Sequence, residues 1–501
     1  MRRQLHILVV LGGLLLFAGI LVLALSFAGM DKQRHHYRAY RDGETVRIVP
    51  VAAVQHADLL RRAQKALLAS RQWVSDPRMP AASYVYTPGS EYNDFFARDF
   101  LFFLEGAGRY FVSAAEVRTA VDFLTLAQPT RNTRIGPLTY PRGAIPDHLA
   151  LDGTPGWGYG NVPAPRPSMD EAFCFITLGW HAGFKSEWDD TWQRWFRAKA
   201  DRFRWAWNSV PRNPRTGLVT QWTTPGHIGA NGIHEYNGAC VMWGFHDSYG
   251  FPGDDLGCSV LACNAAHALA DMFKHVGDQT AEEYWHFRAD AMRDAIRAQF
   301  RREGAVGYLP WGVGDGAPAM ASPDITAYAV WSDILTEAQA NAASDWFAAC
   351  YHRDRHLTTG DLFAMVPGHH GAVRMARKRD DCSPGIHVWP ATDSRHWENL
   401  TYGYNAYQDG GYWYYMSLPI AATLWRKNPL IAVEWVQNIY ADVFSHRFEI
   451  PCERLDGRRP VATAYLASVS ALVGMSFPGH FHLSSISLPR QQLLHRHLTA
   501  D

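Results

Sequence analysis

The sequence predicts an all-α protein: an (α/α)6 barrel of six helical hairpins, preceded by one N-terminal transmembrane helix. Three observations support this prediction. Helical periodicity recurs over most of the chain. The connections between the helical segments alternate between long and short, and an uncharged apolar run lies near the amino terminus. Strand-like alternation is nearly absent, and residues 47–51 and 217–220 are the best short candidates.

The apolar run spans 7–28 and follows Arg2 and Arg3. A helix of this length extends roughly 33 Å, which is enough to cross the hydrocarbon core of a bilayer. Cleaved signal sequences usually have apolar stretches of about 7–15 residues. The run therefore favours a retained membrane anchor over residues 1–30, with cleavage after the small-x-small triplet 26–28 as the alternative. We expect the rest of the chain to lie on the periplasmic, extracellular or lumenal side.

Apolar residues between positions 256 and 273 recur at intervals of three and four, which places them on one face of a helix. The same periodicity predicts helices in twelve segments. These are 58–74, 94–106, 114–128, 170–184, 187–208, 256–277, 281–301, 323–334, 337–352, 412–426, 429–445 and 461–475.

Long connections such as 129–169 and 209–255 alternate with short ones such as 278–280. Successive antiparallel helices send alternate connections to opposite ends, so the long loops should gather at one end, where function concentrates. A helical solenoid would show a repeated sequence period, which this chain lacks. The domains expected are the anchor, a linker over 31–55, the barrel over 56–490 and a tail over 491–501.

The composition narrows the choice of partner. Lys plus Arg and Asp plus Glu both number 48, so the chain lacks the net basic charge that nucleic-acid binding requires. Aromatic residues are abundant, with 19 Trp, 22 Tyr and 25 Phe. The seven cysteines form no CxxC pair and no HExxH string occurs. We therefore expect no metal and no cofactor.

Strings of polar and aromatic residues lie in or beside the long loops, where they could meet a ligand. They are Glu91–Phe100, Ile145–His148 with Arg166–Glu171, Trp222–Asp255, Tyr407–Trp413 and Phe448–Gly457.

These strings resemble motifs of the six-hairpin glycosidase superfamily, which includes trehalases, processing α-glucosidases, glucoamylases and α-rhamnosidases. Arg98 and Asp99 look like the sugar-binding Arg-Asp pair early in those barrels. Gly244–Ser248 resembles the string that carries the general acid in trehalases and processing α-glucosidases. Tyr407–Trp413 is similar to a Tyr-Gln/His-Asn-Gly-Gly-x-Trp string, with Asp409 in place of Asn. The resemblance implies a glycoside hydrolase, inverting as in those relatives, that acts on an oligosaccharide or glycoconjugate.

The chemistry of glycoside hydrolysis supports the same conclusion, because it usually needs two carboxyl groups on either side of the scissile bond. Asp247 lies among Trp243, Phe245 and Tyr249, and an apolar setting raises a carboxyl pKa and suits a general acid. Glu453 is the expected general base, because a carboxylate beside Arg454 can stay ionised. The predicted substrate-binding residues are Arg98, Asp99, Trp243, His246, Gln408, Asp409 and Trp413.

Several positions have plainer interpretations. Asp247 and Ser248 could form a turn, and Arg98 with Asp99 could be a buried ion pair that ties helices together. Asp254–Asp255 is expected to cap the helix that follows. Asp94 and Asp170 are equally well placed as N-caps.

Other residues and other functions remain open alternatives. Glu449 could replace Glu453 as the base, and Glu235 is a third acid candidate. A polysaccharide lyase would use a Tyr/His or Asn/Arg group, and His227, His234, Tyr236 and His246 keep that alternative open. Epimerases and phosphorylases share the barrel, and a non-catalytic glycan-binding protein is the alternative outside enzymology.

Overall fold

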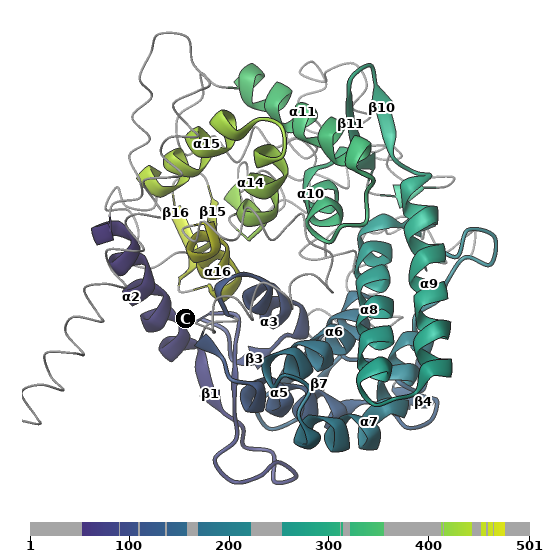
Figure 1. Ribbon diagram of the computed structural model, residues 1–501. Helices are drawn as coiled ribbons and strands as arrows, with labels where there is room; N and C mark the ends of the chain where they lie inside the picture. The colour runs from purple at the N-terminus through teal and green to yellow at the C-terminus, as the bar shows by residue number, and fades with distance from the viewer. Residues whose placement is uncertain are drawn as a thin grey trace, which may run out of the picture. The chain divides into compact units, whose positions relative to one another are not determined.

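The computed structural model describes residues 53–89, 91–108, 111–135, 138–157, 169–221, 253–310, 312–313, 321–354, 412–413, 415–442, 452–456, 459–463 and 465–475 (Figure 1). The chain divides into the units Met1–Val54 and Gln55–Asp501, and the second unit is described below. The predicted membrane helix, the linker before Ala53 and the C-terminal tail lie outside the described residues.

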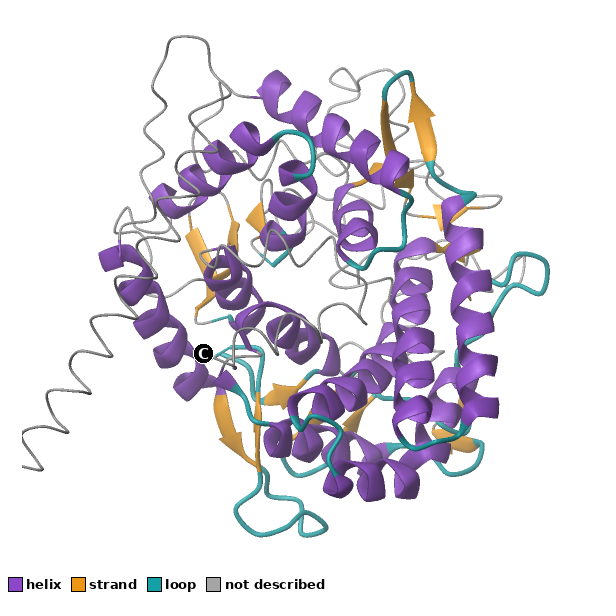
Figure 2. Ribbon diagram, viewed as in Figure 1, coloured by secondary structure: helices purple, strands orange, loops and turns teal. Residues whose placement is uncertain are grey.

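Helices dominate the described part of the chain (Figure 2), and each of the twelve predicted segments overlaps a helix. The helices are α2 (Ala53–Ser70), α3 (Ala97–Phe103), α5 (Ala114–Ala127), α6 (Met169–Lys185), α7 (Asp190–Ser209), α8 (Leu256–His275), α9 (Gln279–Arg297), α10 (Pro323–Trp331), α11 (Glu337–Asp354), α14 (Ser417–Trp425), α15 (Pro429–Asp442) and α16 (Leu466–Met475). A π-helical turn, η2 (Leu104–Gly108), continues α3.

The expectation that strands are nearly absent is wrong in detail, because small antiparallel sheets occupy the long connections. The strands are β1 (Arg71–Trp73), β2 (Tyr84–Tyr86), β3 (Asp94–Phe95), β4 (Thr133–Ile135), β5 (Leu138–Tyr140), β6 (His148–Ala150), β7 (Pro155–Gly156), β8 (Thr220–Gln221), β9 (Gly253–Asp255), β10 (Arg301–Glu303), β11 (Val306–Pro310), β12 (Gly312–Val313), β13 (Ala321–Ser322), β14 (Tyr412–Trp413), β15 (Cys452–Asp456) and β16 (Arg459–Thr463). Strands this short leave little alternation to detect. The candidate at 217–220 contributes only Thr220, and the candidate at 47–51 lies outside the described residues.

Six helices, called the inner helices below, contact one another in a closed cycle: α3 with α6, α6 with α8, α8 with α10, α10 with α14, α14 with α16, and α16 with α3. Every residue of α3 and α16 is buried, and nearly every residue of α6 and α14. A helix that is apolar all round must be covered on every side. The outer helices α5, α7, α9, α11 and α15 supply the second layer (Figure 1). Each of them has at least one exposed residue.

One helix among the described residues, Leu256–His275, is long and apolar enough to cross a membrane. Most of it (83% of its most apolar window) is buried inside the protein. Its apolar character therefore reflects its place as the inner helix α8.

The turns that follow α6, α8 and α10 share one hydrogen-bond pattern, although the turn after α6 has a second left-handed residue, Trp188 with φ 60°. Each contains a residue in the left-handed region: Glu187 with φ 52°, Gly277 with φ 77° and Asp333 with φ 58°. In each, the next backbone N–H donates to a carbonyl five residues earlier, as in a Schellman motif. The three bonds are Trp188 to Gly183 (2.8 Å), Asp278 to Phe273 (3.0 Å) and Ile334 to Ala329 (2.9 Å).

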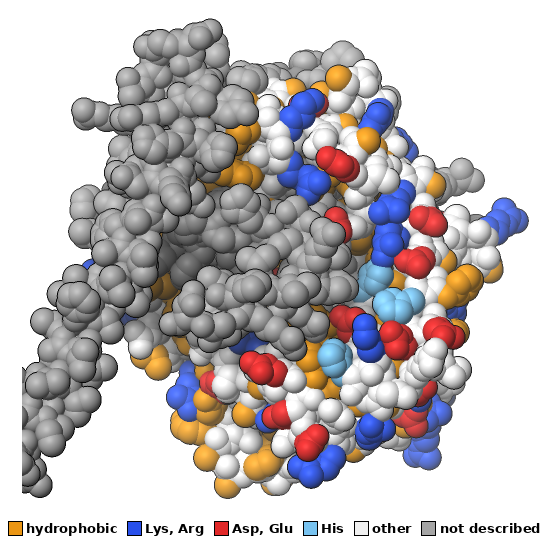
Figure 3. Space-filling model, viewed as in Figure 1, with side chains coloured by type: hydrophobic (Ala, Val, Ile, Leu, Met, Phe, Trp, Pro, Cys, Tyr) orange, Lys and Arg blue, Asp and Glu red, His pale blue; other side chains and the backbone are white. Residues whose placement is uncertain are grey.

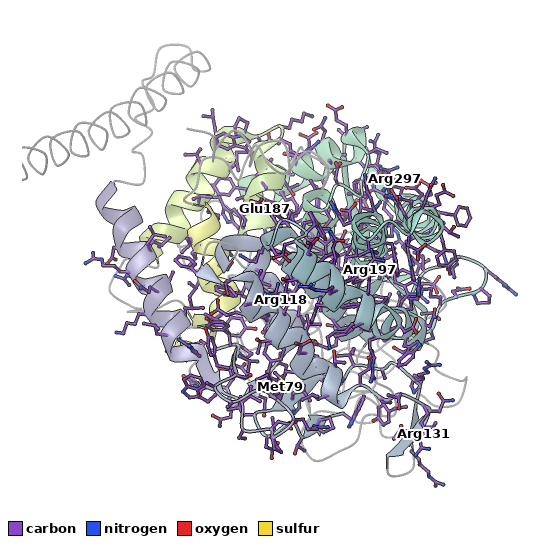
Figure 4. All side chains as sticks on the ribbon, turned by 60° about the horizontal axis from the view of Figure 1, so that its bottom comes forward. Met79, Arg118, Arg131, Glu187, Arg197 and Arg297 are labelled. Atoms are coloured by element: carbon purple, nitrogen blue, oxygen red, sulfur yellow. The ribbon has the colours of Figure 1, made fainter. Side chains whose placement is uncertain are left out.

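The outer helices also hold the carboxyl-terminal ends of the next inner helices. Arg197 of α7 donates to the Val276 carbonyl (2.6 Å) after α8, and Arg297 of α9 donates to the Ile334 carbonyl (2.6 Å) after α10 (Figure 4). The Ser344 hydroxyl of α11 donates to the Leu424 carbonyl (3.0 Å) in α14. These bonds satisfy carbonyls that a helix end leaves without an intrahelical partner.

Candidate active site

The amino-terminal ends of four inner helices carry buried acidic side chains. They are Asp99 in α3, Asp170 and Glu171 in α6, Asp254 and Asp255 directly before α8, and Asp324 in α10. The first turn of a helix has a partial positive charge, which favours carboxylates there. Because these helices contact one another in the cycle, their acidic ends converge.

Arg98 lies at the centre of the largest group, called the Arg98 cluster below. Its Nη1 is 2.9 Å from Asp170 Oδ2, 3.3 Å from Glu171 Oε1 and 3.9 Å from Asp147 Oδ1, and its Nε is 3.8 Å from Asp99 Oδ2. The Arg98 side chain is 5% exposed, and those of Asp170 and Glu171 are fully buried. The Arg98 backbone N–H also donates to Glu171 Oε2 (3.1 Å). The cluster therefore joins the first turns of α3 and α6.

One guanidinium faces four carboxyl groups in this cluster, so not all of them can ionise without cost. Burial lowers the pKa of Arg98, but Asp170, Glu171 and the other carboxylates outweigh it and raise that pKa well above its usual value. Burial raises the pKa of Glu171 well above its usual value, against the effect of Arg98. Burial likewise raises the pKa of Asp99 to about 6, against Arg98 and Tyr465. The cluster can therefore hold protons near neutral pH, as acid–base chemistry requires.

Two tyrosines connect neighbouring inner helices at these ends. The Tyr465 hydroxyl, directly before α16, donates to Asp99 Oδ1 of α3. The Tyr415 hydroxyl, shortly before α14, donates to Asp324 Oδ2 of α10 (3.2 Å). Each tyrosine fixes a carboxyl group at the start of a neighbouring helix in the cycle.

A three-stranded sheet brings two of the predicted motifs together. The order is β14–β15–β16, and Trp413 of β14 pairs with Arg454 of β15, the residue after Glu453. Strand β16 ends at Thr463, two residues before Tyr465. The backbone at Trp413 and Glu453 is thus linked through Tyr465 to Asp99.

His148 extends the Arg98 cluster. Its Nδ1 is 3.0 Å from Asp147 Oδ2, and its ring lies 5.1 Å from that of Phe96. Burial lowers the pKa of His148, but the hydrogen bond and the charge of Asp147 outweigh it and raise the pKa. His148 therefore supplies a second positive charge beside the carboxylates when it is protonated.

The structure thus places Arg98, Asp99 and the backbones of Trp413 and Glu453 at one end of the inner helices. The other predicted site residues and the alternatives for them lie outside the described residues: Asp247, Trp243, His246, Gln408, Asp409, Glu449, Glu235, His227, His234 and Tyr236.

The predicted helix caps have mixed outcomes. Asp255 caps α8, and its Oδ1 accepts from the Cys258 N–H (2.8 Å), as expected. Asp254 instead accepts from Asn213 Nδ2 (2.9 Å) and from the Thr216 hydroxyl (2.7 Å). The predictions for Asp94 and Asp170 are wrong, because the N-cap of α3 is Phe96 and Asp170 lies within the first turn of α6.

Asp147 and Glu171 lie in the polar strings noted in the sequence but had no individual role predicted, and Asp324, Tyr415 and Tyr465 were not predicted at all. A signal existed for two of them: Glu171 and Asp324 are charged residues at the start of otherwise apolar helices. Such a charge is costly to bury unless it serves a purpose. The two tyrosines had no local signal, because aromatic residues are common in the core.

The chain was compared with known proteins. No protein-family profile and no curated protein sequence matches it. Two solved structures are similar over 84% of this chain and 100% of their own, each with 13% sequence identity and a TM-score of 0.50. One is an uncharacterized conserved protein from Thermus thermophilus, and the other is a GH63 mannosylglycerate hydrolase from the same organism in complex with glucose. The chain therefore shares the fold of these two proteins, so the resemblance predicted from the sequence is confirmed for the fold.

Proposed function

We propose that the chain is a glycoside hydrolase built on an (α/α)6 barrel. The barrel is supported by the closed cycle of six inner helices with an outer layer of helices against it. The observation that carries the activity is the convergence of buried carboxyl groups with raised pKa values at the amino-terminal ends of those helices. Such groups can protonate a leaving oxygen and activate water, the two tasks of glycoside hydrolysis.

In this proposal Asp247 is the general acid and Glu453 the general base, and the enzyme inverts the anomeric centre. The assignment of Glu453 is supported by the position of its backbone on β15. The next strand, β16, pairs with β15 and leads to Tyr465, whose hydroxyl donates to Asp99. Asp247 is supported by its position in the connection that enters α8, whose first turn follows Asp254 and Asp255. Arg98, Asp99, Trp413 and the other predicted binding residues would surround the sugar.

The proposed substrate is a hexoside. The fold relative is named for mannosylglycerate hydrolysis and holds glucose, so mannosylglycerate and short glucosides or mannosides are the first compounds to assay. The polysaccharide lyase alternative is disfavoured, because lyases act on acidic polymers, and the carboxylate excess around Arg98 would repel a polyanion.

We also propose that residues 1–30 anchor the protein in a membrane, with the barrel outside the cytoplasm. The 22-residue apolar run supports this. Full-length protein should fractionate with membranes, and removal of residues 1–30 should release a soluble protein with unchanged turnover. A full-length protein with intact Met1 in the soluble fraction would contradict the anchor.

The activity is tested by hydrolysis followed by proton NMR of the first sugar anomer released. Inversion predicts the anomer opposite to that of the substrate. Asp247→Asn should lower kcat by a factor on the order of 10²–10⁴, because general acid catalysis contributes that much. Glu449→Gln is the matched control and should retain most of the turnover. Retention of configuration, or full activity of Asp247→Asn, would overturn the assignment.

A further inference from the structure

A pocket lies between the outer helices α7 and α9. Both helices contact α8, and Figure 1 labels the three. The volume of the pocket is about 430 Å³, within the range of ordinary ligand sites. The residues that line it include Arg204 and Asn208 from α7 and Asp278, Thr280, Tyr284 and Trp285 from α9 and the turn before it. None of them belongs to the candidate active site.

Tyr284 gives this pocket an aromatic wall. Its side chain is 47% exposed, although a large aromatic ring is more stable when covered. The ring has two partners: Arg288 Nε donates to its hydroxyl (3.2 Å), and the ring makes a T-shaped contact with Trp285 at a centroid distance of 5.0 Å. A rigid, half-exposed ring offers a flat apolar surface at little entropic cost to a ligand.

The polar wall is equally fixed. The Arg204 guanidinium lies 4.4 Å from the Phe273 ring centroid, with Nη2 3.6 Å from Asp278 Oδ2 and Nη1 3.3 Å from Asp201 Oδ1. Asp278 Oδ1 accepts from the Ala281 N–H (3.1 Å) and thereby caps α9. The pocket itself is lined by one guanidinium, that of Arg204, and one carboxylate, that of Asp278. These two charges compensate one another, so the pocket favours a neutral ligand.

We propose that this pocket binds a sugar unit of a neutral polysaccharide, as a non-catalytic surface site. A pyranose has one apolar face and a rim of hydroxyl groups. The Tyr284 ring would cover the apolar face, and the amide, carboxylate and guanidinium of Asn208, Asp278 and Arg204 would donate to and accept from the hydroxyls. The site would hold polymer on the protein whether or not the chain hydrolyses it, so the proposal does not rest on the proposed function.

Phe287 offers a matched control. It is an aromatic residue of the same helix, it is 70% exposed, and it does not line the pocket. The test is native affinity electrophoresis of the full chain in detergent, in gels that contain soluble starch or soluble glucomannan. All variants carry Glu453→Gln, which slows hydrolysis if the proposed function is correct and changes nothing if it is not.

In at least one of the two polymers, Tyr284→Ala should weaken retardation at least fivefold relative to Phe287→Ala, and Tyr284→Phe should restore it. Tyr284→Ala in the otherwise native chain should leave turnover of a small glycoside unchanged, which separates this site from the active site. Equal retardation of Tyr284→Ala and Phe287→Ala, or no retardation of the native chain by either polymer, would overturn the proposal.

Discussion

The two ends of the inner helices are built on opposite plans. At the carboxyl-terminal ends, left-handed turns and side chains from outer helices satisfy the last carbonyls, as Arg197 and Arg297 do. At the amino-terminal ends, four carboxyl groups surround the buried Arg98. Both arrangements place charged side chains where the helix dipole favours them. Only at the amino-terminal ends do the buried carboxyl groups outnumber the cation that they surround. In the proposed function, the carboxyl-terminal ends serve stability and the amino-terminal ends serve the chemistry, at a cost in stability.

Figure 3 shows a complementary contrast on the surface. On the face that it displays, acidic and basic side chains of the described residues are interspersed, so neither sign dominates there. The unbalanced charge of the Arg98 cluster is buried. In the protein interior the dielectric constant is low and the charges lie close together. An excess of buried charge there shifts the pKa values of neighbouring groups strongly.

The largest effect should follow from Arg98→Met. This variant leaves four carboxyl groups without their shared cation, and breaking a buried ion pair costs about 3–5 kcal/mol. The free energy of unfolding, measured by urea denaturation at pH 7.5, should fall by about that amount. A loss below about 1 kcal/mol would show that the cluster is already neutralised by bound protons.

Two buried carboxyl groups should make stability depend on pH over different ranges: Asp99 in the first turn of α3, and Glu105 in the π-helical turn η2. Asp99 has a pKa raised to about 6 from 3.8, and Glu105, which accepts from the Tyr328 hydroxyl (2.6 Å), has a pKa raised by burial to about 7 from 4.5. A raised carboxyl pKa stabilises the fold below the unfolded pKa, and this stability is lost as the pH rises through the folded pKa. Each shift corresponds to about 3 kcal/mol.

Stability should therefore decline from about pH 4 to pH 6 for Asp99 and from about pH 4.5 to pH 7 for Glu105. Asp99→Asn should abolish the decline in stability between about pH 4 and pH 6, and Glu105→Gln should abolish the decline between about pH 4.5 and pH 7. Urea denaturation at half-unit pH intervals separates them. A native chain whose stability rises steadily from pH 4 to pH 7 would contradict both shifts.

A smaller loss is expected at the carboxyl-terminal ends. Arg297→Met removes the hydrogen bond to the Ile334 carbonyl, and a bond to a charged group contributes about 1.5–3 kcal/mol. Thermal unfolding should detect this loss while turnover stays unchanged. A folded Arg297→Met variant with reduced turnover would contradict the division of stability and chemistry between the two ends.

The smallest effect, and the only gain, should come from Glu187→Gly. Glu187 is exposed and left-handed, a conformation that costs a non-glycine residue roughly 1–2 kcal/mol. Glycine there should raise the melting temperature slightly. The control is Gly277→Ala at the equivalent turn, which should lower it. Equal melting temperatures for all three proteins would contradict the Schellman geometry.

The helices could be predicted because apolar periodicity is a local property of the chain. Five predicted helices extend into strands that form by pairing with another segment. Residues 71–73, 94–95, 301, 412–413 and 461–463 belong to β1, β3, β10, β14 and β16, which pair with β2, β6, β11, β15 and β15. The repeated support of the inner helix ends was also hidden, since Arg197, Arg297 and Ser344 perform one role with different residue types. This shared role therefore produces no repeat in the sequence.

Site residues that are adjacent in the sequence could be predicted. Site residues that come together only in the folded chain could not. Arg98 and Asp99 are adjacent in sequence and could be identified together. Tyr465 reaches Asp99 from the other end of the chain, so no local pattern connects them. Asp170 was interpreted as a cap because a carboxylate at a helix start usually is one. Its burial against Arg98 arises only when α3 and α6 pack together.

The most direct test of the division between the two ends compares Glu453→Gln with Arg197→Met, measuring turnover of the hydrolysed glycoside and melting temperature for each. Glu453→Gln should lose a factor on the order of a hundred or more in kcat at an unchanged melting temperature, since a general base contributes about 10²–10⁴. Arg197→Met should keep its turnover and melt at a lower temperature. Full turnover in Glu453→Gln, or loss of turnover in a folded Arg197→Met, would contradict the account.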